Sequence, residues 1–182
     1  MKDEPIWIAL FSQTGTELRE LENYLGISPT IVMSNSKIYD KTSWNNKSSF
    51  WKKSHNEIVY WLLNAYDEKT LSRVIITLHG YLRILPPEVC NKYKIYNGHP
   101  ALINLYPELK GKDPQIRTWQ NNSKYPIIGS IVHRVVAEVD AGEIVSSVAY
   151  TNRIESENEM FTQLRISSFH AWKWFLRNKL CV

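Results

Sequence analysis

The chain has 182 residues, of which 43% are hydrophobic and 22% are charged, a composition that suits one globular domain with a substantial core and a ligand cleft. Its formal net charge is +4, and the basic residues are scattered rather than gathered into runs, which excludes the usual signature of a nucleic-acid-binding protein. We therefore predict a single domain over residues 1–182 that needs no nucleic acid.

The two cysteines, Cys90 and Cys181, lie far apart and form no CxxC pair, so neither a disulfide framework nor a zinc site is indicated. No secretory leader is recognised at the charged start of the chain, and no apolar run approaches the roughly 20 residues that span a bilayer. These features predict a soluble, cytoplasmic protein with no metal and no membrane partner.

The first elements read as a strand, a helix and a second strand. Residues 6–11 are continuously apolar, as expected of a parallel strand buried on both faces. Thr16 is then predicted as the N-cap of a helix that ends at Gly26, and residues 30–33 supply the second strand. The helix is indicated by apolar residues at three- and four-residue spacing, namely Leu18, Leu21, Tyr24 and Leu25.

Residues 34–54 are polar and have no clean period, which predicts a long surface excursion that could cover a ligand. Three aromatic residues within it argue against plain disorder, and these are Tyr39, Trp44 and Phe50. A helix is expected over residues 56–66, with Ile58, Val59, Leu62 and Leu63 on its buried face. Residues 74–78 follow as a buried strand that ends at His79.

The second half of the chain continues with a short strand over residues 93–97 and a helix over 115–120 that begins after Asp113-Pro114. Residues 129–136 and 143–149 are two further strands, joined by a hairpin or a crossover. Ser156 and Glu159 form a capping box before a long final helix, whose apolar face is marked by Phe161, Leu164, Ser168, Trp172 and Phe175.

Strands that alternate with helices predict an α/β fold, a Rossmann-like open and mostly parallel sheet flanked by helices. In such sheets ligands bind beyond the carboxyl ends of the strands. The polar segments to examine are therefore residues 12–16, 79–85 and 97–100.

The segment Asn97-Gly98-His99-Pro100 carries the clearest chemical signal. Strand alternation can point the Asn97 amide and the His99 imidazole the same way, with Gly98 allowing close backbone approach. An amide and an imidazole together suit an oxyanion site. The Asp140-Ala141-Gly142 turn can bring a carboxylate to His99, which would raise its pKa and fix its tautomer. Alone, each of these residues is equally a strand-end cap or a turn residue.

Four segments together resemble the folate-dependent formyltransferase family in order and approximate spacing. They are Gly80-Tyr81-Leu82-Arg83-Ile84-Leu85, Asn97-Gly98-His99-Pro100, Gly129-Ser130-Ile131-Val132-His133 and Val139-Asp140-Ala141-Gly142. The resemblance covers roughly residues 7–149 and implies a formyltransferase-type single domain.

This resemblance implies transfer of a formyl group from 10-formyltetrahydrofolate to an amine, without a metal. Asn97 and protonated His99 would stabilise the tetrahedral oxyanion, and Asp140 would pair with His99 and help move the proton. The residues that would bind the folate are Tyr81, Arg83, Ile84, Leu85, Val136 and Val139. His133 reads as a structural histidine near this site, and His79 as either a pocket wall or a strand-end cap.

The acceptor side departs from the family pattern. Members that act on glycinamide ribonucleotide carry a phosphate loop of the form Ser-Gly-x-Gly-Ser-Asn, whereas this chain has Ser-Gln-Thr-Gly-Thr-Glu at residues 12–17. A backbone cradle for phosphate would survive around Thr14, Gly15 and Thr16, but an inward Glu17 would repel the anion. Lys110 and Lys112 are a second place for an acceptor phosphate, although each is equally a solvent-facing lysine.

The acceptor predicted is a small phosphorylated amine, an amino-nucleotide or glycinamide ribonucleotide type of molecule. An amino-sugar nucleotide is the alternative, because sugar N-formyltransferases share the Asn-x-His-Pro and Asp-x-Gly core. Methionyl-tRNA is disfavoured, since that branch carries a further C-terminal domain. The chain is also compatible with a folate- or nucleotide-binding module without turnover, and less so with a plain Rossmann-like domain, because it lacks GxGxxG. A monomer or a homodimer is expected.

Overall fold

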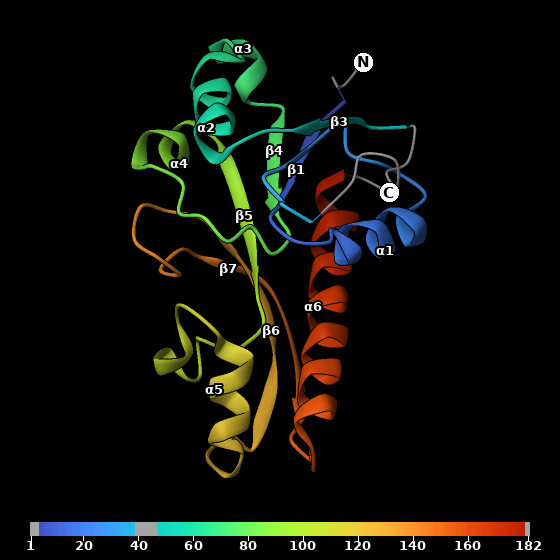
Figure 1. Ribbon diagram of the computed structural model, residues 1–182, viewed down its shortest axis with the longest axis vertical. Helices are drawn as coiled ribbons and strands as arrows, with labels where there is room; N and C mark the ends of the chain where they lie inside the picture. Colours follow the sequence, from blue (N-terminus) through green and yellow to red (C-terminus); the bar gives the residue numbers. More distant parts are fainter. Residues whose placement is uncertain (1–3, 39–46, 181–182) are drawn as a thin grey trace. The chain divides into compact units, whose positions relative to one another are not determined.

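The computed structural model describes residues 4–38 and 47–180 (Figure 1). The strands lie in one seven-stranded sheet of order β3-β2-β1-β4-β5-β6-β7, and the first five strands in this order are parallel to one another. Strands β6 and β7 are antiparallel. The predicted α/β class with a mostly parallel sheet is confirmed.

The chain forms two compact units. Unit 1 comprises residues 1–97 and 135–137, and unit 2 comprises residues 98–134 and 138–182. The strand β5 runs across the division after Asn97. That the whole chain acts as a single domain stays a prediction.

Unit 1 is built from parallel strands connected through helices, as continuous apolar runs predict. Its elements are β1 (Ile6–Phe11), α1 (Thr16–Leu25), β2 (Ile31–Ser34), β3 (Ser49–Lys52), α2 (His55–Asn64), α3 (Glu68–Leu71), β4 (Val74–Leu78), α4 (Pro87–Lys92) and β5 (Lys94–His99). Predicted strands at residues 6–11 and 74–78 coincide with β1 and β4.

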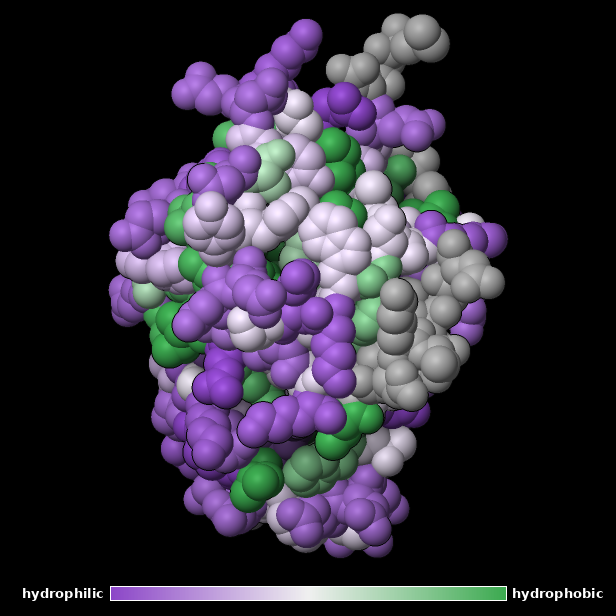
Figure 2. Space-filling view, turned by 45° about the horizontal axis from the view of Figure 1, so that its top comes forward, coloured by the Kyte–Doolittle hydropathy of each residue, from purple (hydrophilic) through white to green (hydrophobic). Residues whose placement is uncertain are grey.

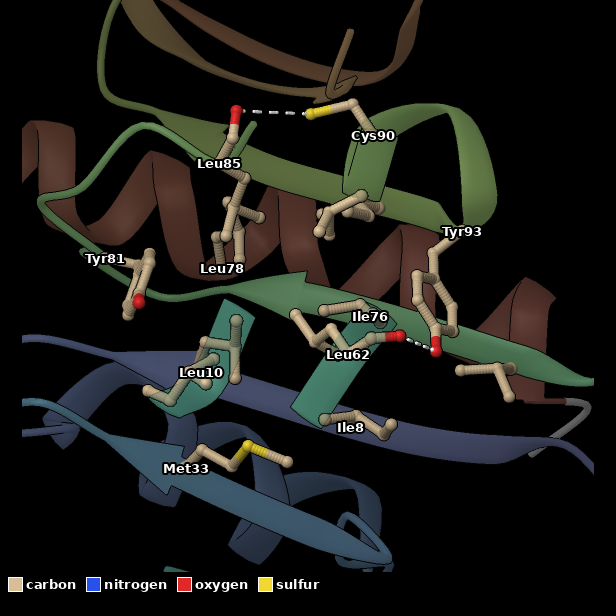
Figure 3. Close-up of a cluster of buried hydrophobic side chains, with 14 of the residues drawn as sticks. Ile8, Leu10, Met33, Leu62, Ile76, Leu78, Tyr81, Leu85, Cys90 and Tyr93 are labelled. Atoms are coloured by element: carbon tan, nitrogen blue, oxygen red, sulfur yellow. Dashed lines mark hydrogen bonds between the residues drawn. The ribbon is translucent and has the colours of Figure 1, made fainter. Parts of the chain in front are cut away.

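The core of unit 1 lies where β1, β2, β4 and β5 meet α2 and α4 (Figure 3). Ile8, Leu62 and Ile76 are fully buried there, and burial of such a side chain stabilises the fold by about 1.5–3 kcal/mol. The Tyr93 hydroxyl donates to the Leu62 carbonyl at 2.5 Å, so the polar tip of this buried ring is satisfied.

Unit 2 contains η2 (Pro107–Leu109), α5 (Pro114–Gln120), η3 (Asn122–Lys124), β6 (Ile127–Arg134), β7 (Ile144–Thr151) and the long helix α6 (Glu157–Leu180). The antiparallel pairing of β6 with β7 shows that these strands form a hairpin rather than a crossover. Helix α6 packs against both strands, and the Ser130 hydroxyl donates to the Leu164 carbonyl at 2.9 Å.

Three expectations about unit 1 are wrong. The polar stretch 34–54 contains β3, which pairs in parallel with β2, because backbone pairing does not require an apolar run at a sheet edge; its Tyr39 and Trp44 lie outside the described residues. Gly15, in the left-handed conformation, is the N-cap of α1, and Thr16 is its first residue. Leu63 is 39% exposed, because it lies outside the stripe that Ile58 and Leu62 bury.

The predicted capping box of α6 forms in part. The Ser156 hydroxyl accepts from the Glu159 N–H at 3.3 Å, but the Glu159 carboxylate accepts from the Glu155 N–H rather than from that of Ser156. Phe161, expected on the buried face, is 38% exposed.

The face drawn in Figure 2 is mostly hydrophilic, with apolar side chains in small separate patches. Within residues 4–38 and 47–180, no helix is both long enough and apolar enough to cross a bilayer. Cys90 is buried and its thiol donates to the Leu85 carbonyl, while Cys181 lies outside the described residues.

Candidate active site

Strand β5 carries both Asn97 and His99. The two residues are separated by one position, so the alternation of a strand places their side chains on the same face of β5. In unit 1, Asn97 lies opposite Leu78 of β4 in the register, which puts it at the carboxyl end of the parallel strands. In unit 2, a Cβ on Gly98 would collide with the Trp172 indole nitrogen. Only glycine therefore fits between the two polar residues.

His99 and Asp140 form a buried pair in unit 2. His99 Nδ1 lies 3.4 Å from Asp140 Oδ2, and the exposed fractions of their side chains are 5% and 9%. His99 Nε2 lies 2.9 Å from the Leu109 carbonyl oxygen, and Asp140 Oδ2 accepts from the Gly111 N–H at 2.8 Å. The sequence-predicted pair is thus brought together, and the segment 109–111 contacts both members.

His133 is a third member that the sequence reasoning took for a structural residue. Its Nε2 lies 3.4 Å from Asp140 Oδ1, with 2% of its side chain exposed, and its Nδ1 lies 3.0 Å from the Arg134 carbonyl. The Asp140 carboxylate is therefore flanked by one histidine at each oxygen. We call His99, His133 and Asp140 the Asp140 cluster. A histidine inside the apolar strand β6 was the available signal.

The hydrogen bonds to backbone carbonyls assign the tautomers of both histidines. A carbonyl oxygen only accepts, so His99 carries a proton on Nε2 and His133 carries one on Nδ1. The second nitrogen of each ring faces Asp140. At His99 this contact becomes a hydrogen bond when Nδ1, or the carboxylate, takes up a proton. The cluster is therefore arranged to accept and release a proton.

Burial lowers the pKa of His99, and this effect exceeds the opposing influence of Asp140 and of the Leu109 carbonyl; the nearby His133 and Arg117 also lower it. Burial raises the pKa of Asp140, but the hydrogen bond from His133, the charge of His99 and the Gly111 N–H together hold that pKa below its ordinary value. These directions describe an ionised carboxylate beside a neutral imidazole as the resting arrangement.

The loop between β6 and β7 orients the Asp140 carboxylate toward His99 and His133. Asp140 has φ 53, a left-handed conformation that non-glycine residues adopt rarely and aspartate tolerates better than most. A Cβ on Gly142 would collide with the Arg134 carbonyl, so the Asp-x-Gly spacing has a steric reason. The tight return of the chain places Asp140 against both histidines.

The residues predicted to bind folate divide into buried and exposed sets. Tyr81 and Leu85 are buried in the core of unit 1. The Tyr81 hydroxyl lies 2.9 Å from His55 Nδ1, and burial raises its pKa to about 12. Arg83 is exposed, and Ile84 is 72% exposed. Val136 and Val139, which belong to different units, are also exposed. Exposed Ile84 and buried Leu85 suit a loop that offers backbone and apolar surface to a flat ligand.

The carboxylate that follows the predicted phosphate cradle contacts a buried histidine. Glu17 Oε2 lies 3.1 Å from His79 Nδ1, and the exposed fractions of the Glu17 and His79 side chains are 22% and 0%. His79 Nε2 lies 3.0 Å from the Thr77 hydroxyl, which also accepts from the Trp7 indole at 2.8 Å. We call these four residues the Glu17 chain. His79 thus holds Glu17, and its two predicted roles, pocket wall and strand-end cap, stay predictions.

Thr14 and Thr16 are exposed and hydrogen-bond each other at 2.8 Å. Lys110 and Lys112 are also exposed, and Lys112 Nζ lies 3.6 Å from Asp113 Oδ2. Within residues 4–38 and 47–180, no group of three or more His, Cys, Asp or Glu side chains is arranged to hold a metal ion.

Residues 62–167 match the model of a known family, described as formyl transferase, over more than half of the chain. The chain belongs to the formyl transferase family. This family assignment covers β4 to β7 and part of α6, and therefore includes the Asp140 cluster. It agrees with the resemblance seen in the four sequence segments.

One relative of the chain is phosphoribosylglycinamide formyltransferase from Dictyostelium discoideum. It is 31% identical to this chain over 100 residues. The match covers 49% of this chain and 48% of that protein, so the chain spans about half the length of this relative.

Two solved structures share the fold. Phosphoribosylglycinamide formyltransferase from Anaplasma phagocytophilum matches 96% of this chain and 86% of its own, with a TM-score of 0.78 and 20% identity. The enzyme of that name from Campylobacter jejuni matches 97% of this chain and 98% of its own, with the same TM-score of 0.78 and 20% identity. At this identity the two structures support the fold and nothing finer.

Proposed function

We propose that the protein transfers a formyl group from 10-formyltetrahydrofolate to the amine of a small phosphorylated acceptor. The observation that carries this proposal is the Asp140 cluster, a buried carboxylate with an imidazole nitrogen facing each oxygen. Membership of the formyl transferase family supports the reaction class.

In the proposed reaction the acceptor amine attacks the formyl carbon, and a C–N bond forms as the carbonyl electron pair moves to oxygen. Asn97 and His99 donate hydrogen bonds to the resulting oxyanion. His99 and Asp140 pass the proton from the attacking nitrogen to N10 of the folate. The bond between the formyl carbon and N10 then breaks, which leaves an N-formyl product and tetrahydrofolate.

His99 needs a free donor to act on the oxyanion, and in this structure its Nε2 proton is directed at the Leu109 carbonyl. When Nδ1, which faces Asp140, takes up a proton, the His99 ring becomes a cation. The positive charge strengthens the hydrogen bonds that either ring nitrogen donates. Substrate binding is therefore proposed to exchange the Leu109 carbonyl for the formyl oxygen as the acceptor of the Nε2 proton.

The folate is proposed to bind through the backbone of Arg83, Ile84 and Leu85 and through the loop that holds Val136 and Val139, with Tyr81 as a wall. Ser12 supports the first of these loops, because its hydroxyl accepts from the Leu82 N–H at 2.8 Å and donates to the Asn35 side chain at 2.7 Å. The exposed Ile84 side chain and the ordered backbone beside it suit a flat heterocycle.

Glu17 favours an amino-sugar nucleotide as the second candidate acceptor. Its carboxylate lies in the first turn of α1, where the helix dipole would otherwise favour an anion such as phosphate. A carboxylate there instead favours hydroxyl or ammonium donors, which sugars present. For the ribonucleotide type of acceptor, Thr14, Gly15 and Thr16 or the exposed Lys110 and Lys112 would receive the phosphate.

The test is an absorbance assay for tetrahydrofolate release from 10-formyltetrahydrofolate, run against glycinamide ribonucleotide, amino-nucleotides and amino-sugar nucleotides. Release that depends on one acceptor class and is lost in His99→Ala is the expected result. His170→Ala removes a histidine elsewhere in unit 2 and serves as the matched control. Folate binding without release for any acceptor would instead support a binding module without turnover.

A further inference from the structure

Arg117 binds the backbone of the segment that contacts the Asp140 cluster. Its Nη1 donates to the Glu108 carbonyl at 2.6 Å, and its Nη2 donates to the Leu109 and Lys110 carbonyls at 3.0 Å and 2.7 Å. Three consecutive carbonyls are therefore held by one guanidinium. The planar fork of an arginine spreads its donors over separate nitrogens, whereas a lysine ammonium has all three donors on one nitrogen.

The segment held by Arg117 touches both His99 and Asp140. The Leu109 carbonyl accepts from Arg117 and also from His99 Nε2, and the next residue but one, Gly111, donates its N–H to Asp140 Oδ2. A displacement of this segment would remove a partner from each member of the pair. Arg117 itself is anchored on α5, whose residue Thr118 donates to the Pro114 carbonyl at 2.8 Å.

The hydrogen bonds of the Arg117 side chain are incomplete. Arg117 Nε is buried without a hydrogen-bond partner among the described residues, and an unsatisfied buried donor is unfavourable. Arg117 also brings a positive charge toward a buried histidine. Two unfavourable features at one residue indicate that its position serves the site rather than stability alone.

We propose that Arg117 is a positioning residue for the His99–Asp140 pair, and that it acts by holding the Leu109 carbonyl and the Gly111 N–H in place. The held carbonyl keeps the His99 proton on Nε2, so that Nδ1 is the nitrogen that exchanges a proton with Asp140. The importance of this role for catalysis rests on the proposed function. The tautomer of His99 and the position of the segment held by Arg117 do not depend on that function.

The charge of Arg117 has a separate consequence. The titratable and charged groups that face His99 are Asp140, which raises its pKa, and His133 and Arg117, which lower it. Burial lowers this pKa as well, and removing the guanidinium takes away one of the three lowering influences, so the pKa of His99 rises. The charge and the fork can therefore be separated by two variants, Arg117→Lys and Arg117→Met.

The experiment is a pH titration of the full chain by NMR, with ¹⁵N-labelled histidine rings to report the tautomer and midpoint of His99. Amide hydrogen exchange at Gly111 is measured on the same variants. In Arg117→Met we expect the midpoint to move to higher pH, the Nδ1–H form of His99 to appear, and exchange at Gly111 to quicken by at least about tenfold, because the segment loses its charged hydrogen bonds.

Arg117→Lys keeps the charge without the fork. Its midpoint should stay near that of the wild type, while Gly111 exchange quickens as in Arg117→Met. Arg153→Met removes an exposed arginine of the same unit and should change neither quantity. In the formyl-transfer assay, the pH above which activity falls should move upward in Arg117→Met only.

Unchanged His99 tautomer and unchanged Gly111 exchange in both Arg117 variants would overturn the proposal, whatever their activity. If Arg117→Met does not fold, Arg117→Lys still decides the role of the fork through Gly111 exchange and through the His99 tautomer. A wild type that shows the expected tautomer but transfers formyl to no acceptor would overturn the proposed function and leave the role of Arg117 standing.

Discussion

At the carboxyl ends of the strands in unit 1, the Glu17 chain ties an acidic side chain to a buried histidine, whereas in unit 2 the Asp140 cluster ties an acidic side chain to two. Both arrangements place a carboxylate against buried imidazole. They differ in the partner of the ring nitrogen that does not face the carboxylate. His79 is hydrogen-bonded onward to Thr77, while the second nitrogens of His99 and His133 face backbone carbonyls.

This difference has a chemical consequence. In the Glu17 chain, the indole of Trp7 can only donate to Thr77, which leaves the Thr77 proton for His79 Nε2 and the His79 Nδ1 proton for Glu17. Every group is then satisfied without an extra proton, which suits a fixed carboxylate. In the Asp140 cluster the Leu109 carbonyl accepts the proton of neutral His99, so the contact between His99 and Asp140 gains a proton only by uptake from outside this pair.

The largest effect should come from breaking the Asp140 cluster. His99→Ala and Asp140→Asn should each cut turnover by orders of magnitude. The first removes a donor to the oxyanion, which costs about 2.7–4 kcal/mol in barrier height, and the second removes the carboxylate that pairs with His99. Folate affinity should change little, and both quantities are read from the tetrahydrofolate-release assay and from equilibrium binding. Normal turnover in either variant would contradict the mechanism.

Gly98→Ala tests whether the site depends on the close packing of Trp172. The added Cβ would collide with the Trp172 indole, and overpacking of this kind costs about 1–3 kcal/mol. Urea denaturation should show that loss of stability. The double variant with Trp172→Phe should recover part of it, and a Gly98→Ala protein as stable as the wild type would mean that the packing is looser than described.

Glu17→Asn tests the role of the acidic side chain in unit 1. Loss of the carboxylate from the first turn of α1 should improve binding of a ribonucleotide acceptor by about 0.3–1 kcal/mol, the usual size of a charge effect at a helix end. Calorimetric titration with glycinamide ribonucleotide measures this, with Glu20→Gln on the same helix as control. Unchanged affinity would show that Glu17 does not oppose the phosphate.

The smallest effect expected is a slope in stability against pH. Burial lowers the pKa of His99 below its usual 6.5, so the unfolded chain binds more protons near and below that pH and the folded state loses stability as pH falls from neutral toward the folded pKa. Urea midpoints between pH 7 and 5 should show this decline. His99→Gln should reduce it, and an identical decline in that variant would assign it to other groups.

Much of the fold follows from local pattern in the sequence. Residues 6–11 and 74–78 are apolar at almost every position because their strands are covered on both faces, and such runs can be recognised without any tertiary information. Strand β3 could not be recognised, because an edge strand is held by backbone pairing to β2 and needs few apolar side chains. Leu63 shows the same limit, since only packing decides which residue at the margin of an amphipathic stripe is covered.

The sequence alone determined the family, through four short motifs in order, and with it the expectation that His99 and Asp140 meet. Tertiary structure alone decided that His133 completes the cluster and that His79 holds Glu17. It also decided that Arg117 holds the segment beside His99. These pairings join residues from 7 to 62 positions apart, and such contacts depend on how strands and loops return to one place, which local propensity does not encode.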